Sequence, residues 1–153
     1  MEEHPGGSVQ ARARQAVATL EAMERELNDT HAQVQGLGFF ARGFVERDIS
    51  GATGRGFLEW IAATARVRQA IAPLAAGSQA PAARQTLADE LPRLAKLRAY
   101  LQKAPDKVNM VPAGMLKPAQ RSQFLVAVAE QSAQLGLLET ALTAISADIA
   151  AAH

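Results

Sequence analysis

Arginine and aromatic side chains that could bind an anion or a partner protein are concentrated in one stretch of the sequence. Four of the five phenylalanines and the only tryptophan lie within residues 39–60. The same stretch carries Arg42, Arg47 and Arg55. A guanidinium offers paired N–H donors that match the oxygens of a carboxylate or a phosphate. Exposed aromatic and arginine side chains are also frequent anchors at protein interfaces, so this stretch predicts anion capture or partner docking.

The glycines of the same stretch add a weak anion-binding feature. Gly51, Gly54 and Gly56 precede a predicted helix, whose free amides and positive dipole end attract anions. The pattern follows a helix instead of a strand, and it lacks the lysine and the serine or threonine of a P-loop. Packing of the aromatic side chains in the core is the simpler interpretation of this stretch, and anion capture and docking are the functional ones.

A second unusual segment, residues 104–118, contains three of the seven prolines and is apolar for a connection. It either folds back over the protein or offers an adaptable, methionine-rich surface to a partner helix. The candidate anion-binding residues are Arg42, Arg47 and Arg55, and the candidate partner-binding residues are Phe39, Phe40, Phe44, Phe57, Trp60, Met110 and Met115. Basic residues outnumber acidic ones around these segments, which favours an acidic or amphipathic partner.

Several catalytic and metal-binding chemistries find no support in the sequence. The chain has no cysteine, which excludes disulfides, thiolate nucleophiles and iron–sulfur clusters. His4 and His153 lie at the termini, and no Glu-x-x-His pair typical of metal sites in helical bundles occurs. His31 differs from the histidine of phosphotransfer domains, because its glycine follows at five residues instead of four and no lysine lies between. We expect no metal, no cofactor and no enzymatic activity.

The elements that position these residues are predicted to be helices. Apolar residues recur at alternating steps of three and four from Val9 to Phe44, and three later segments share this spacing. Alanine and leucine dominate the apolar content, which favours helix over sheet. We expect an all-α, antiparallel up-down-up-down four-helix bundle, in which residues 39–60 and 104–118 lie at the same end. The two long outer helices cover about 8–49 and 118–152, and the two shorter inner ones cover about 56–76 and 80–103.

Charge is distributed unevenly over a chain whose net charge is +1. Residues 51–121 carry 11 basic and 4 acidic side chains, whereas the flanking segments are acidic. Ion pairs between acidic outer helices and basic inner ones explain this pattern, and a nucleic-acid surface over residues 66–98 is the alternative. We expect one domain over 8–153 after a disordered lead-in over 1–7. Since no apolar leader or membrane-length apolar run occurs, a cytoplasmic protein is expected, with an excised extracytoplasmic domain as the alternative.

Two functions from different classes follow from these features. The first is a non-enzymatic interaction protein, such as an adaptor, an assembly or secretion chaperone, or a phage or plasmid accessory factor, which docks a partner at the end formed by residues 39–60 and 104–118. The second is a sensor domain that binds a small anionic ligand between helices at that end. The expected layout resembles that of four-helix bacterial chemoreceptor sensor domains. The alanine-rich last helix also predicts a homodimer through the first and last helices.

Overall fold

The computed structural model describes residues 5–152, and these form five α-helices without a β-strand. The helices are α1 (Pro5–Gln35), α2 (Phe39–Thr53), α3 (Phe57–Ala75), α4 (Ala83–Met110) and α5 (Pro118–Ala151). The predicted all-α class is therefore confirmed. The predicted lengths of the helices need correction at two places.

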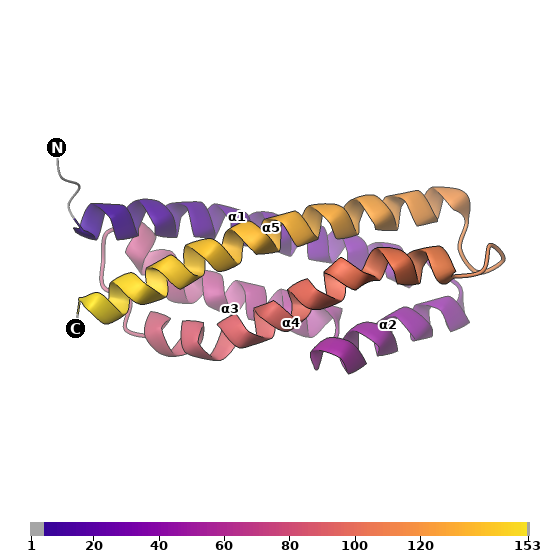
Figure 1. Ribbon diagram of the computed structural model, residues 1–153, viewed down its shortest axis with the longest axis horizontal. Helices are drawn as coiled ribbons and strands as arrows, with labels where there is room; N and C mark the ends of the chain where they lie inside the picture. Colours follow the sequence, from indigo (N-terminus) through magenta and orange to yellow (C-terminus); the bar gives the residue numbers. More distant parts are fainter. Residues whose placement is uncertain (1–4, 153) are drawn as a thin grey trace.

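The helices lie side by side along one long axis (Figure 1). α1 packs along α3 and α5, and α4 packs along α5. α1 leads away from the end that holds the C-terminus, α2 and then α3 lead back, α4 leads out again, and α5 returns. We call the end with the turns after α1 and α4 the loop end. The opposite part, where α1, α3, α4 and α5 face one another, is called the terminal half.

The first correction concerns the helix predicted over residues 8–49. This prediction is wrong, because the chain leaves the helical path at residues 36–38, between α1 and α2. Gly36 and Gly38 flank a single leucine there, and glycine loses more backbone entropy in a helix than any other residue. The apolar spacing continues across this break, which is why periodicity alone predicted one helix.

The start of α1 also differs from expectation. α1 begins at Pro5, inside the segment 1–7 that was predicted to be a disordered lead-in. Residues 1–4 and 153, including the termini that carry His4 and His153, lie outside the described residues.

The second correction concerns the connection predicted over residues 104–118. α4 runs through Pro105 to Met110, so that the connection to α5 is only residues 111–117. Ala104 is buried and Val108 packs against the core, which favours continued helix at this point. Burial of apolar surface thus outweighs the helix-breaking tendency of the proline.

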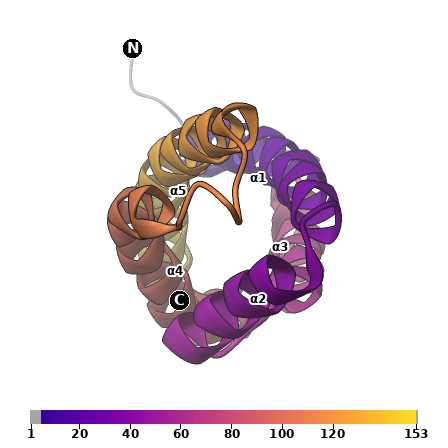
Figure 2. The same cartoon turned by 90° about the vertical axis from the view of Figure 1, so that its right-hand side faces the viewer.

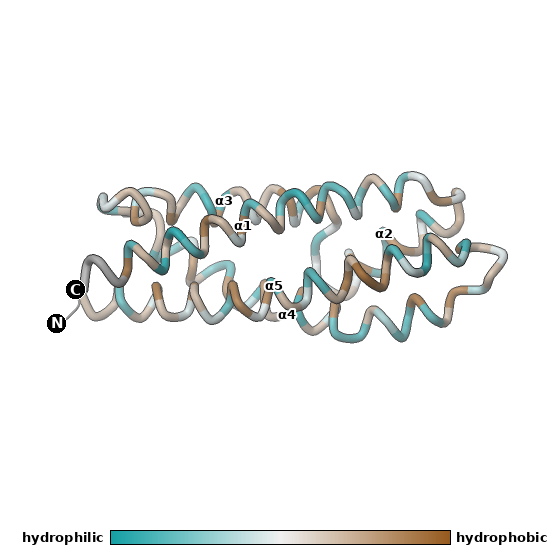
Figure 3. Tube along the Cα trace, turned by 90° about the horizontal axis from the view of Figure 1, so that it is seen from above, coloured by the Kyte–Doolittle hydropathy of each residue, from teal (hydrophilic) through white to brown (hydrophobic). Residues whose placement is uncertain are grey.

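The core follows the predicted spacing in the terminal half and through most of α1. Leu20, Met23, Leu135, Leu138 and Leu142 are among the fully buried large side chains. Hydrophilic and hydrophobic segments alternate along the helices (Figure 3). Among residues 5–152, no helix is both long and apolar enough to cross a membrane.

Candidate functional site at the loop end

α2 is the least firmly held helix of the loop end. It contains Gly43 and Gly51, and each interior glycine costs a helix about 1 kcal/mol relative to alanine. Only Ala41, Ile49 and Thr53 among its fifteen residues are buried. Seen down the long axis, α2 closes one side of a ring of helices, and the connection between α4 and α5 crosses part of the opening (Figure 2).

Large apolar side chains are exposed where α2 meets the connection 111–117. Phe39 and Phe40 are 75% and 77% exposed, and Met110 is 81% exposed. The two phenyl rings pack edge to face with their centroids 5.5 Å apart. Phe44 and Met115 are also exposed. We call these five residues the aromatic patch.

The aromatic patch borders a groove at the tip of the loop end. Both glycines of the turn after α1 line this groove, opposite Gly114, Met115 and Lys117 of the connection. The predicted proximity of the two unusual segments is therefore realised for residues 39–44 and 111–117. Residues 50–60 instead lie farther along the bundle, where α2 ends and α3 begins (Figure 1).

A cavity of about 100 Å³ lies inside the loop end, between α1, α2, α4 and α5. Its lining is almost entirely apolar and includes Val34, Ile49, Leu101, Ala104 and Val128. Protein interiors are usually packed as densely as organic crystals. An empty apolar volume of this size costs about 2 kcal/mol, at roughly 24 cal/mol per Å³. The interior of the loop end is thus incompletely filled around this cavity.

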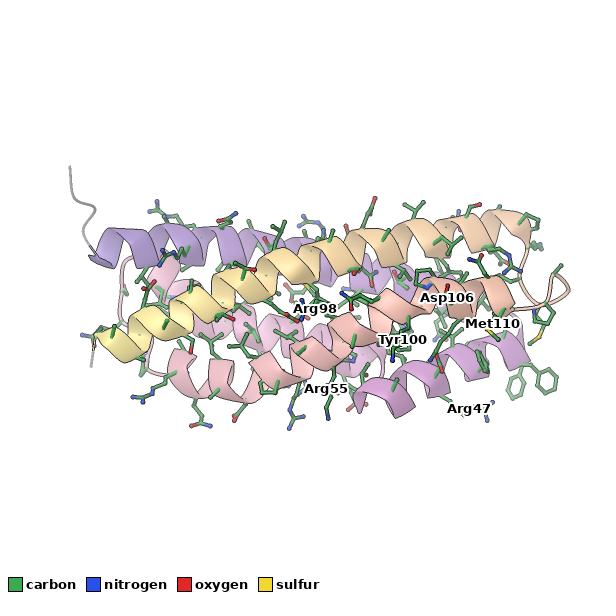
Figure 4. All side chains as sticks on the ribbon, viewed as in Figure 1. Arg47, Arg55, Arg98, Tyr100, Asp106 and Met110 are labelled. Atoms are coloured by element: carbon green, nitrogen blue, oxygen red, sulfur yellow. The ribbon has the colours of Figure 1, made fainter. Side chains whose placement is uncertain are left out.

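Polar groups close the cavity between α2 and α4. The Tyr100 hydroxyl donates a hydrogen bond to the Asp48 carboxylate at 2.9 Å, and the Lys107 ammonium donates to the same carboxylate at 3.0 Å. Tyr100 lies between α4 and α2 in Figure 4. Burial, and then the negative charge of Asp48, raises the pKa of the Tyr100 phenol. This cluster is one of the few polar attachments of α2.

Attachment of α2 to α1 is weaker still. The side-chain amide of Gln35 donates to the Glu46 carboxylate at 2.7 Å on the exposed surface. On the side of α4, Arg121 of α5 donates to the backbone carbonyls of Val108 and Val111, which fixes the end of α4 and the start of the connection. The rim of the cavity is therefore firm along α4 and α5 and loosely held along α2.

The three candidate anion-binding arginines do not come together. The Arg55 guanidinium is buried and donates to both Glu90 oxygens, at 2.7 and 2.9 Å. Arg47 points away from the bundle (Figure 4), and its Nε donates to the Gly43 carbonyl of its own helix. The Arg42 guanidinium lies 6.0 Å from the centroid of the Phe39 ring.

The Arg55–Glu90 pair anchors the junction between α2 and α3. The Arg55 guanidinium stacks 5.0 Å from the Trp60 ring centroid, and the indole N–H of Trp60 donates to the Thr53 hydroxyl at 2.9 Å. The hydrogen bonds from Arg55 lower the pKa of Glu90, and the hydrogen bonds to Glu90 raise the pKa of Arg55. Arg66 adds a longer contact to Glu90 at 3.4 Å.

This junction also defines the environment of two candidate partner-binding residues. Trp60 is fully buried and Phe57 is buried. Phe57 lines the cavity, and its ring centroid lies 5.9 Å from that of His31. Glu90 could not be recognised from the sequence, because its partner Arg55 lies 35 residues away and no local pattern connects them.

The basic middle of the chain pairs with acidic residues on neighbouring helices. Three such ion pairs are Arg68 with Glu24, Arg98 with Glu139, and Lys107 with Asp48. They join inner helices α3 and α4 to α1, α5 and α2. This arrangement agrees with the ion-pair explanation of the uneven charge. It leaves fewer of the basic side chains over residues 66–98 free to contact a nucleic acid.

Neither a protein-family model, nor a curated protein, nor a solved structure matches this chain. The fold and the site are therefore interpreted from their own residues. Within residues 5–152, no group of three or more acidic or histidine side chains could hold a metal ion. What the loop end offers chemically is an exposed aromatic patch, a groove beside it and an apolar cavity beneath α2.

Proposed function

We propose that this protein is a non-enzymatic interaction protein that docks an amphipathic helix of a partner on the aromatic patch of the loop end. The supporting observation is the exposure of Phe39, Phe40, Phe44, Met110 and Met115 at the loop end, where Phe39, Phe40 and Met115 line one groove. Contiguous exposed apolar side chains on a protein surface commonly mark interaction sites. Methionine side chains also adapt their shape to a helix laid into an apolar groove.

The charges around the patch favour a partner helix that carries acidic residues beside its apolar face. Residues 36–48 and 103–121 contain six basic and three acidic side chains. The basic residues are Arg42, Arg47, Lys103, Lys107, Lys117 and Arg121, and the acidic ones are Glu46, Asp48 and Asp106. Charge complementarity of this kind mainly increases the rate of association and selects among partners.

The geometry changes the roles that we assign to the predicted partner-binding residues. Trp60 and Phe57 are buried, so we propose that they support α2 and the cavity wall instead of contacting the partner. In this proposal α2 and α3 together form the second leg of an up-down-up-down bundle. The break between these two helices places the aromatic patch at the end of that leg.

Capture of a small anionic ligand is the function that the geometry favours less. A shared site would need at least two of the three candidate arginines to converge. Arg55 is instead occupied by Glu90, and Arg47 points outward. Partner docking requires no such convergence, because exposed arginines around an apolar patch suffice.

Site-specific photo-crosslinking in the cells that express the protein tests the proposal. A photoreactive phenylalanine analogue replaces Phe40 in one variant and Leu137, an exposed leucine on α5, in the control variant. We expect a defined protein to crosslink at position 40 and not at 137. Mass spectrometry of the crosslinked peptide should identify an amphipathic segment with acidic residues.

A second pair of variants distinguishes specific docking from non-specific hydrophobic binding. Phe39→Ser with Phe40→Ser should abolish capture of that partner, whereas Leu137→Ser should leave it unchanged. Binding of the partner should weaken as salt is raised, because the surrounding charges are exposed and screened. The same crosslinks from positions 40 and 137, or capture that survives the double serine variant, would contradict the proposal.

A further inference from the structure

The cavity beneath α2 shares Phe44 and Met115 with the aromatic patch, whereas Phe39 and Phe40 do not line it. We propose that it is a binding site for a compact, uncharged apolar molecule, such as a single ring or a short branched chain, which enters past α2. Its volume of about 100 Å³ approaches that of an apolar cavity in another protein, about 150 Å³, which holds benzene. The proposal does not depend on a partner protein.

The lining of the cavity selects an uncharged ligand. Its polar groups already bond within the chain, because Gln131 donates to the Thr30 hydroxyl at 2.7 Å and Asp48 accepts from Tyr100 and Lys107. Among the described residues, none of the buried side-chain atoms without a hydrogen-bond partner belongs to a residue that lines the cavity. A charged ligand would lose its water without gaining a partner.

The position of the void supports a binding role over a packing defect. Phe44 lines the cavity, yet its side chain is about half exposed instead of filling the space. Phe39 and Phe40 lie farther out on the same helix. Apolar side chains large enough to fill the void are thus close by and remain outside it. Because these side chains do not occupy the cavity, an apolar ligand could bury its own surface there, and this burial would favour binding.

α2 supplies the route of entry. Glycine-containing turns flank it, at residues 36–38 and 54–56, and Gly54 adopts a left-handed conformation with φ of 81°. Its polar attachments are the exposed hydrogen bond from Gln35 to Glu46, the Asp48 cluster and, at its last residue, the hydrogen bond from Trp60 to Thr53. Local opening draws on such regions, which have few buried side chains and exposed hydrogen bonds.

Nuclear magnetic resonance titration of the full chain with toluene, and with benzoate as its charged counterpart, tests the ligand class. We expect toluene to shift the backbone amide signals of Val34, Ala104 and Val128 saturably, and to bind at least tenfold more tightly than benzoate. Absence of saturation, or equal binding of benzoate, would overturn the proposal.

Cavity-filling variants locate the site. Ala104→Leu on α4 and Ala41→Leu on α2 each add a side chain at the cavity wall, and each should weaken toluene binding at least tenfold. Circular dichroism shows whether each variant is folded. If one of them misfolds, the other, on a different helix, still tests the site. Retained binding in both folded variants refutes the site.

A control separates the cavity from the aromatic patch. Phe39→Ser with Phe40→Ser should leave toluene binding unchanged, so that a failure of partner docking and a failure of ligand binding are distinguishable. Loss of toluene binding in this variant would place the ligand on the patch and overturn the proposal.

Hydrogen exchange tests the route. In the free protein the α2 amides should exchange faster than those of α3, and toluene should slow them. Exchange of α2 as slow as that of α3 would exclude entry past α2.

Discussion

The terminal half and the loop end share three helices and differ in the fourth. In the terminal half α3 completes the interior, and it buries seven of its nineteen residues. At the loop end α2 takes this place and buries three of its fifteen residues. A helix with two interior glycines and a small buried face leaves a cavity inside and phenylalanines outside. The comparison indicates that stability is concentrated in the terminal half and at the α2–α3 junction, while the loop end retains surface and volume for binding.

The largest effect should come from the ion pair at the junction. Glu90→Ala leaves the buried Arg55 guanidinium without its carboxylate, and breaking a buried pair in this way costs about 3–5 kcal/mol. Denaturant unfolding measures the loss. Glu24→Ala, which removes a similarly short but partly exposed pair with Arg68, should cost about 1 kcal/mol or less.

A double variant tests whether the unpaired charge causes this loss. Glu90→Leu combined with Arg55→Met replaces both partners by apolar side chains and should be more stable than Glu90→Ala. A loss from Glu90→Ala no larger than that from Glu24→Ala would remove the junction as a centre of stability.

The next prediction is a difference in sign between the two regions. Ala63 is buried in the packed part of α3, where added methylenes overpack the core, so that Ala63→Leu should cost about 1–3 kcal/mol. Ala104 lies at the cavity wall, where Ala104→Leu should gain about 0.5–2 kcal/mol by filling empty volume. Thermal or denaturant unfolding gives both values. Equal losses in the two variants would mean that the loop end is packed as tightly as the terminal half.

Much of the core could be predicted from the spacing of apolar residues. Leu20, Leu27 and Val34 are buried as the pattern in α1 predicts, and Leu135 and Leu142 are buried in α5. Periodicity worked there because each helix has one apolar stripe that faces the same neighbours along its length.

The loop end could not be predicted in the same way. Phe44 continues the apolar spacing of α1 but is about half exposed, because the break at residues 36–38 starts a new helix with a different orientation. A glycine within an apolar pattern is compatible with both a helix and a turn. The partner of Arg55 is Glu90 on another helix, and only the packing of α3 against α4 brings the two together.

Glycine variants within α2 and at its C-terminal cap should have smaller effects, again of opposite sign. A Cβ at Gly51 meets nothing within 4 Å, so Gly51→Ala should stabilise the protein by about 0.5–1 kcal/mol. Gly54 has φ of 81°, and Gly54→Ala should cost about 1–2 kcal/mol because an L-residue is strained there. Hydrogen exchange should show slower opening of α2 in Gly51→Ala. Equal effects of the two variants would argue against a weak helix that ends in a left-handed turn.

The smallest prediction uses pH to separate two carboxylates. Hydrogen bonds from Arg55 lower the pKa of Glu90, so its stabilising contribution is present above the ordinary value of 4.5 and is lost as pH falls through the lowered pKa. Burial, and then the charge of Glu130, raises the pKa of Glu26, and one Glu26 oxygen is buried without a hydrogen-bond partner. Ionised Glu26 therefore destabilises the folded state at neutral pH, and this penalty disappears as the group protonates.

Glu26→Gln keeps an oxygen that can accept the hydrogen bond from Gln134 and removes the charge. We expect a small rise in melting temperature at pH 7 that vanishes as pH falls to about 4.5, the ordinary value for the glutamate carboxyl. Glu90→Gln should instead lower the melting temperature at pH 7, and the deficit should shrink only at more acidic pH, where Glu90 of the unchanged protein loses its charge. A melting-temperature series from pH 3 to 8 for both variants measures these opposite trends. Parallel curves would show that the two carboxylates sit in equivalent environments, which would remove the electrostatic contrast between the junction and the face of α1 and α5.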